Sequence, residues 1–145
     1  MMDSDKRLDL DRVALELRER IISTLGQPCA VRRGLDGGEW FVAGDPPEVV
    51  VRLDETTVSV MWYEAGWKGP HEPFSRAVPL VTVHWHEVEI RDVWLMCEML
   101  IDKTRARRQA TFGTCRYCGK TYGPEDMDEK DLCQGCAERH LGTVH

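Results

Sequence analysis

The sequence lacks several features that would assign it to a well-defined class of protein. No apolar run approaches the ~18–20 residues that a helix needs to cross a bilayer, so we expect no membrane contact. The first residues are acidic and polar, unlike a secretory or transit peptide, which favours a cytoplasmic protein. Internal repeats and low-complexity tracts are absent too. The chain is therefore expected to be an ordinary globular protein.

Recognisable catalytic motifs are also missing. There is no glycine-rich phosphate loop, no Gly-x-Ser-x-Gly elbow and no His-Glu-x-x-His pattern. The formal charge is −6, whereas nucleic-acid binders draw most of their affinity from positive charge placed against phosphates. Composition thus favours a non-enzymatic binding protein and makes nucleic acid the less expected ligand.

Hydrophobic content is sufficient for a packed core. The 145 residues are 42% hydrophobic and include five tryptophans, enough for one modest domain and a small additional module. Apolar residues at three- and four-residue steps predict amphipathic helices over residues 8–25 and 87–109. Between them, short β-prone segments separated by turn residues predict strands over 29–33, 39–43, 48–53, 57–63 and 77–83. Pro79 marks the last of these as an edge strand.

This element order predicts an α+β fold. We expect an antiparallel β-meander of four or five strands, flanked by N- and C-terminal helices that pack on one face. The predicted domains are an α+β domain over residues 1–110 and a small C-terminal four-cysteine zinc finger over residues 111–145.

Four of the six cysteines form two Cys-x-x-Cys pairs separated by fourteen residues: Cys115 and Cys118, then Cys133 and Cys136. Four thiolates at such spacing can surround one tetrahedral Zn²⁺ and leave no coordination site open for catalysis. Gly119, after the first pair, and Gly135, inside the second, are expected to permit the tight turns required. We therefore predict one structural zinc ion.

The residues around the cysteines add local detail. Residues 120–122 favour a short strand, Gly123-Pro124 a turn, and the residues after Cys136 a short helix ending at Gly142. A knuckle, a hairpin and a ligand-bearing helix resemble a treble-clef zinc finger, or a zinc ribbon, over residues 112–141. The resemblance implies a structural zinc, and because treble clefs serve many functions it implies little else.

Other interpretations of the cysteines fit the sequence less well. Two disulfides suit a secreted chain, and a redox pair needs one Cys-x-x-Cys in a thioredoxin-like setting. His140 and His145 are reserve zinc ligands, but a helix-end histidine and a solvated C-terminus are the preferred interpretation. Cys29 and Cys97 lie among apolar residues, so we expect them to be buried as small hydrophobes.

Residues 64–75 contain two glycines and two prolines and are predicted to form a long loop. The loop carries Trp67, His71 and Phe74, and loops that display aromatic rings are common recognition surfaces. We hypothesise that this segment binds a protein partner. The alternative is that the rings fold back and anchor the loop on the core.

Six positive charges and no acidic residue lie between residues 103 and 120: Lys103, Arg105, Arg107, Arg108, Arg116 and Lys120. A basic helix end that leads into a finger could bind phosphates, with Tyr117 stacking on a base. The alternative is that these cations complement the helix dipole and neutralise the zinc cage and the acidic residues 125–131.

His84 and His86 are two residues apart and could point to the same side of a strand. With His71 and the nearby Glu87 and Glu89 they could form a second, catalytic metal site of a hydrolase. No recognised ligand spacing supports this, and polar residues at a strand-to-helix junction are the simpler explanation. The sequence does not indicate the oligomeric state.

Overall fold

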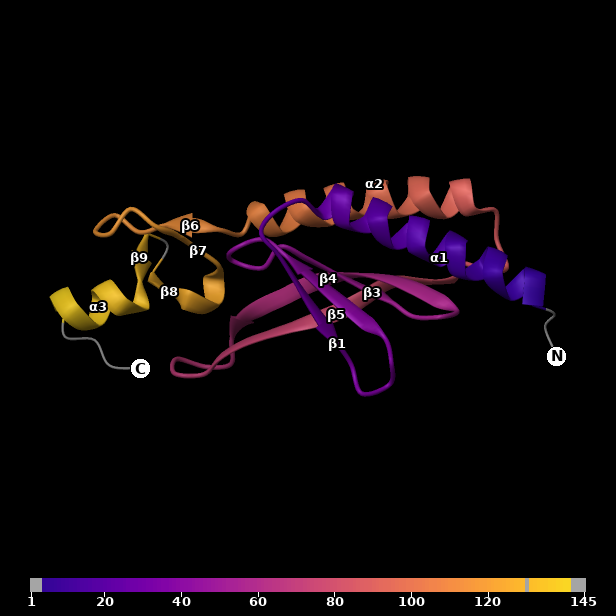
Figure 1. The fold of residues 1–145 in the computed structure, drawn as a ribbon. Coiled ribbons are helices and arrows are strands. Elements are labelled where there is room, and N and C mark those ends of the chain that lie inside the picture. The colour runs from indigo at the N-terminus through magenta and orange to yellow at the C-terminus, as the bar shows by residue number, and fades with distance from the viewer. Residues whose placement is uncertain (1–3, 130, 142–145) are drawn as a thin grey trace.

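A computed structural model of the chain describes residues 4–129 and 131–141 (Figure 1). It confirms the predicted fold class. Along the chain, an N-terminal helix is followed by the five strands of an antiparallel sheet, a second long helix and a module that contains four cysteines. The elements of the first part are α1 (Ser4–Leu25), β1 (Cys29–Arg33), β2 (Glu39–Ala43), β3 (Val49–Leu53), β4 (Thr57–Trp67), β5 (Pro73–His84) and α2 (Ile90–Gln109).

The sheet is a simple meander in which each strand pairs with the next along the chain, in the order β1-β2-β3-β4-β5. Helices α1 and α2 lie side by side over one face (Figure 1). Alternate residues of the central strands point into this layer, as the period of two requires. The inward side chains include Phe41, Val49, Val51, Val58 and Val60, all fully buried.

Both helices bury one stripe of side chains. In α1 the buried positions include Leu17, Ile21 and Leu25, and in α2 they include Val93, Cys97 and Ile101. Spacings of four residues place each set on one helix face. None of the helices in the described residues has both the length and the apolar composition that a membrane crossing requires.

The prediction for the two cysteines outside the pairs holds for Cys97. It lies in the core, and burial raises the pKa of its thiol to about 12. Cys29 is only half-buried at the start of β1. Burial also raises the pKa of Cys29, against the opposing effect of the positive charge on Arg105.

The prediction of a long loop over residues 64–75 is wrong. Strands β4 and β5 continue through this segment, and only residues 68–72 form the turn, which the Lys68 N–H closes by donating to the Glu72 carbonyl (2.7 Å). Gly69, with a φ of 73°, and Pro70 lie in the turn itself. Pro73 suits β5 because β5 is an edge strand, where a residue without an N–H can be accommodated. Leu80, next to Pro79, is the extra residue of a β-bulge opposite Val60 and Met61.

The C-terminal module consists of short elements beyond the end of α2 (Figure 1). They are β6 (Gly113–Thr114), β7 (Thr121–Tyr122), the 3-10 helix η1 (Pro124–Asp126), β8 (Met127–Glu129), β9 (Leu132–Cys133) and α3 (Gln134–Leu141). Strand β6 pairs with β7, and β8 pairs with β9. The predicted helix stop at Gly142 and the reserve ligand His145 lie outside the described residues.

Candidate metal centre

The four paired cysteines converge on one point. Their sulfur atoms all lie within 4.8 Å of one another, and Cys118 Sγ is 3.9 Å from Cys133 Sγ. A tetrahedral Zn²⁺ with Zn–S bonds of ~2.3 Å places its sulfurs roughly 3.8 Å apart, whereas a disulfide requires about 2.0 Å. All six cysteines of the chain are free thiols. The cluster therefore has the dimensions of a metal site.

The first pair lies in a tight knuckle after β6. The Cys115 N–H donates to the Lys120 carbonyl and the Gly119 N–H donates to the Cys115 carbonyl, both at 2.9 Å. Gly119 has a φ of 72°, in the left-handed region that side chains disfavour. This agrees with the expected role of Gly119 in the turn.

The second pair lies at the junction of β9 and α3. Cys133 ends the strand and Cys136 is in the first turn of the helix, where its N–H donates to Cys133 Sγ (3.4 Å). Arg139, one turn later, donates to Cys136 Sγ (3.3 Å). The expected tight turn at Gly135 is wrong, because Gly135 is an ordinary helical residue with no positive φ. The helix start itself brings the two sulfurs together.

Backbone N–H groups lower the pKa of two of the four cysteines, Cys115 and Cys118. Burial would raise the pKa of Cys115, but hydrogen bonds from the backbone of Cys133, Cys118 and Tyr117 lower it to about 6. The Lys120 N–H and then the Tyr122 hydroxyl lower the pKa of Cys118. Burial raises the pKa of Cys136 to about 11, which favours the protonated thiol. A metal ion would have to displace that proton.

This donor set suits a closed metal site. Four sulfur ligands match soft or borderline metals, and N–H groups directed at the sulfurs support the ligands from outside the first coordination sphere. Cys115, Cys133 and Cys136 are buried, whereas Cys118 is at the surface. The four cysteines can hold a metal ion, which agrees with the resemblance to a cysteine zinc finger.

The module is docked on the sheet through η1, which lies between the two cysteine pairs. The Trp67 indole N–H donates to the Pro124 carbonyl (2.8 Å), joining the end of β4 to η1. Gln134 of α3 donates to the Glu125 carbonyl (2.9 Å), so the helix that carries Cys136 also contacts η1. The position of the metal cluster is thereby linked to the β4–β5 hairpin.

Arg108 forms the second link between the two regions. It is only 4% exposed and donates to both carboxylate oxygens of Glu125, at 2.6 and 3.3 Å. Its Nε donates to the Pro47 carbonyl (2.9 Å), and its guanidinium lies 4.8 Å from the centres of the Tyr63 and Phe112 rings. The sequence reveals the positive charge of Arg108 and the acidity of residues 125–131, but not this pairing.

The aromatic residues proposed to bind a partner have different environments. Trp67 is half-buried against η1, so the alternative that this ring anchors its segment is the better description. Phe74 is half-buried on β5, with the Lys68 ammonium 5.7 Å from its ring centre. His71 is exposed in the hairpin turn. The three side chains therefore do not form one displayed loop surface.

Most of the basic segment contacts other protein groups. Arg105 donates to the Thr24 and Leu25 carbonyls at the end of α1. Other contacts are Arg105 with Glu48 (3.6 Å), Arg107 over the Trp62 ring (4.6 Å) and Arg116 with Asp131 (3.1 Å). Lys103 and Lys120 are exposed. These contacts favour the interpretation in which the cations neutralise nearby carboxylates and helix ends.

The histidines do not assemble into a second metal site. The register of β4 with β5 places His71 at the turn and His84 at the opposite end of the hairpin, roughly 30 Å away for ten residues of strand. His86 Nδ1 is 3.1 Å from the Thr56 carbonyl oxygen. The rings of His84 and His86 are in edge-to-face contact, with their centres 6.1 Å apart. Among the residues that the structure describes, the four cysteines are the only group able to hold a metal.

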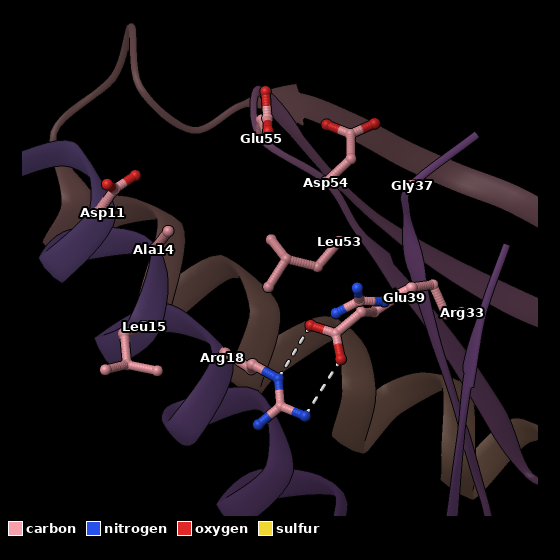
Figure 2. A pocket seen from close by; sticks show the side chains of 10 residues that line it. All are labelled: Asp11, Ala14, Leu15, Arg18, Arg33, Gly37, Glu39, Leu53, Asp54 and Glu55. Atoms are coloured by element: carbon pink, nitrogen blue, oxygen red, sulfur yellow. Dashed lines mark hydrogen bonds and ion pairs between the residues drawn. The ribbon is translucent and has the colours of Figure 1, made fainter. Parts of the chain in front are cut away.

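A groove of about 270 Å³ lies at the other end of the molecule, between α1 and the β1–β2 and β3–β4 turns (Figure 2). Arg18 and Glu39 face each other across it, joined by hydrogen bonds of 2.9 and 3.1 Å. Asp54, on its wall, accepts from Arg52, Thr56 and Thr57. Partial burial would raise the pKa of Asp54, but these bonds hold it well below its usual range. Arg18 thus pairs with Glu39 within the groove, and Asp54 pairs with Arg52 beside it.

One aromatic contact on the module was not expected from the sequence. Tyr117, 49% exposed, stacks on His140 with ring centres 4.9 Å apart, and the Arg116 guanidinium lies 5.2 Å from the Tyr117 ring centre. This arrangement identifies His140 as a stacking residue of α3 and not as a member of the cysteine cluster.

Comparisons of the chain with protein-family models, with curated proteins and with solved structures find no match.

Proposed function

We propose that this chain is a non-enzymatic zinc-binding protein that acts as a protein-interaction module, with one structural zinc ion held by Cys115, Cys118, Cys133 and Cys136. The observation that carries the proposal is the convergence of four cysteine sulfurs within 4.8 Å. Four thiolates form a closed tetrahedral site, which is typical of structural zinc. In this proposal the module over residues 112–141 is a treble-clef finger.

The small size of the module supports a structural role for the metal. Among the residues whose burial is described, its buried cluster contains only Met127, Leu132 and Ala137 besides cysteines, with Tyr122 packed against it. Such a small core does not hold a chain folded by itself, and metal binding supplies the missing free energy. The α+β domain over residues 1–110 has a separate and larger core, which supports treating residues 111–145 as a second unit. A reducing compartment such as the cytoplasm would keep the thiols available.

The interaction role rests on how the module and the hairpin meet. Trp67 and Arg108 bind η1, so zinc binding fixes the β4–β5 hairpin relative to the finger. Phe74 and the exposed His71 lie on this hairpin, and Tyr117 is exposed on the finger. Aromatic side chains held on rigid elements are suitable anchors for a protein partner.

Elemental analysis tests the zinc site. We expect one zinc per chain in the wild type, loss of zinc in Cys115→Ser and Cys133→Ser, and full zinc content in the control Cys97→Ala, whose thiol is buried in the other core. Iron bound to the cysteines, or a wild type with no metal and two disulfides, would contradict the proposal.

The hydrolase alternative needs a second metal. It therefore predicts a second ion per chain that is lost in a His84→Ala/His86→Ala variant. A zinc content of one, unchanged in that variant, would remove this alternative.

Affinity capture tests the interaction role. Phe74→Ala/His71→Ala should lose a partner that the wild type retains, while its zinc content stays unchanged. Leu35→Ala, which alters a fully exposed side chain away from the finger, is the matched control and should retain the partner. Equal recovery of the partner with all three proteins would leave the hairpin without a role.

Nucleic-acid binding remains the second candidate, because exposed Tyr117, Arg116 and Lys120 lie together on the first knuckle. It predicts an affinity that falls steeply with salt and drops in Lys103→Glu/Lys120→Glu. Both lysines are exposed, so the variant should fold normally. Absence of retention on heparin at low salt would count against this function.

A further inference from the structure

The two edges of the sheet differ in how they are protected. Edge strands present unpaired N–H and C=O groups and can pair with another strand unless something blocks them. Strand β5 carries Pro73 and Pro79 and a bulge at Leu80, and all three interrupt a regular ladder. Strand β1, at the other edge, is regular and lacks proline. Of these two edges, β1 is therefore the more open to continued pairing, although its five residues include two arginines.

The hydrogen bonds that flank β1 show which of its groups face this edge. The Pro28 carbonyl accepts from the Gly44 N–H (2.9 Å), and the Gly34 N–H donates to the Gly38 carbonyl (2.7 Å). In an antiparallel ladder the N–H and C=O of every second residue point to the same side. Residues 30 and 32 therefore pair with β2, while Cys29, Val31 and Arg33 direct their backbone groups outward.

The side chains beside this edge are also accessible. Val31, at the centre of β1, is 46% exposed. The groove next to α1 borders β1 at Arg33 (Figure 2). A second groove, of about 530 Å³, is lined by Ala30, Arg32, Val42 and Asp45. An added strand would therefore find space on either side.

We propose that β1 pairs antiparallel with β1 of a second copy of this chain, about a two-fold axis at Val31, so that two five-stranded sheets become one continuous sheet. In this register Val31 exchanges both backbone hydrogen bonds with Val31 of the second copy. Cys29 does the same with Arg33 of the second copy, and Arg33 with its Cys29. All three outward-facing residues are then satisfied.

Charge supports this register over its neighbours. Pairing about Val31 places Arg32 opposite Ala30 and Arg33 opposite Cys29, so no arginine faces an arginine. Ala30 shares its groove with Asp45, which offers a carboxylate to the incoming Arg32. Shifting the axis to Arg32 or Arg33 sets like charges opposite each other, which is unfavourable. If the two-fold axis is shifted to Ala30 or Cys29, Arg33 extends beyond the end of β1 in the second copy and has no residue of that strand opposite it.

A proline substitution tests the pairing without removing a bond of the native ladder. The Val31 N–H faces the open edge, so Val31→Pro removes only the outward donor. Val31→Thr keeps the N–H and a β-branched side chain and is the matched control. By analytical ultracentrifugation we expect a wild-type dimer, a Val31→Thr dimer of similar affinity, and a dissociation constant for Val31→Pro raised about tenfold or more, since two hydrogen bonds per dimer are lost.

Residue-resolved hydrogen exchange identifies the interface. In the dimer, the amides of Cys29, Val31 and Arg33 should exchange slowly, and dilution should release them. The amides of Ala30 and Arg32 should stay protected in monomer and dimer alike, because they bond to β2. Circular dichroism and zinc content of Val31→Pro should match the wild type, which separates a lost interface from a lost fold.

Three results would overturn the proposal. The first is a wild type that is monomeric at every concentration, which includes the case of an edge reserved for a different protein. The second is a Val31→Pro variant that folds and still dimerises with wild-type affinity. The third is a dimer in which the amides of Cys29, Val31 and Arg33 exchange rapidly. None of these depends on zinc, so the metal proposal stands or falls separately.

Discussion

The α+β domain and the C-terminal module solve the problem of stability in different ways. The domain buries Leu, Ile, Val and Phe side chains between two helices and a sheet, with Ile101 and Phe41 fully enclosed. The module buries few such side chains and gathers four cysteine sulfurs instead. Hydrophobic burial grows with size, so a unit of about 30 residues needs another source of free energy. In the proposed function, a metal ion held by the four cysteines is that source.

This difference predicts which changes should destabilise each region. The stability of the domain should depend on the volumes of its core side chains. The stability of the module should depend on the metal and on the cysteines that bind it. Trp67 and Arg108 connect the two regions, so these contacts should carry the effect of damage from one region to the other.

The largest effect should come from breaking the cysteine cluster. Cys133→Ser, or a strong chelator, should unfold residues 112–141 and leave the α+β domain folded, because structural zinc contributes about 10 kcal/mol or more to such modules. Limited proteolysis should cut after α2, and the fluorescence of Trp67 should change as Pro124 leaves its indole. Collapse of the whole chain would mean that the two regions fold as one.

A cavity in the larger core should be the next largest effect. Ile101 is fully buried on α2, and Ile101→Ala should destabilise the α+β domain by ~2–5 kcal/mol in urea unfolding. Leu95→Ala, on the same helix but 64% exposed, should change stability by less than about 0.5 kcal/mol. Zinc content should remain at the wild-type level in both variants.

The joint between the regions should contribute less. Arg108→Met leaves the Glu125 carboxylate without its partner and should cost about 3 kcal/mol, since breaking a buried ion pair strands a charge. Adding Glu125→Gln should recover part of that loss. The measurement is the free energy of unfolding of the α+β domain in each variant, with and without a chelator. If Arg108→Met and Arg108→Met/Glu125→Gln lower the free energy of unfolding equally, the ion pair contributes little.

The smallest effect should be on the stability of the α+β domain at acidic pH, and it depends on Asp54. Hydrogen bonds from Arg52, Thr56 and Thr57 outweigh burial and hold the pKa of Asp54 below its usual value. A carboxylate with a lowered folded pKa stabilises above its unfolded pKa of about 4, and this contribution is lost as the pH falls further. The stability of Asp54→Asn should therefore fall less steeply below about pH 4 than that of the wild type. Parallel curves would assign the acid sensitivity to other groups.

Local patterns were sufficient for much of the fold. Spacings of three and four residues predicted both long helices, and β-prone runs between turns predicted β1, β2 and β3 to within one residue. The extension of β4 and β5 through residues 64–67 and 73–76 was missed, because Gly66, Pro70 and Pro73 close together suggest a loop when the pairing of the two strands is not known. Gly135 was misread for a similar reason, since a helix start can bring two cysteines together without a special turn.

The sequence by itself determined the helices, most strands and the four-cysteine cluster, because each depends on residues close together in the chain. Tertiary structure alone decided the environments of Trp67 and Arg108, whose partners Pro124 and Pro47 are 57 and 61 residues away. It also decided which sheet edge stays open. Such contacts depend on how whole elements pack, and a pattern of neighbouring residues carries no information about that packing.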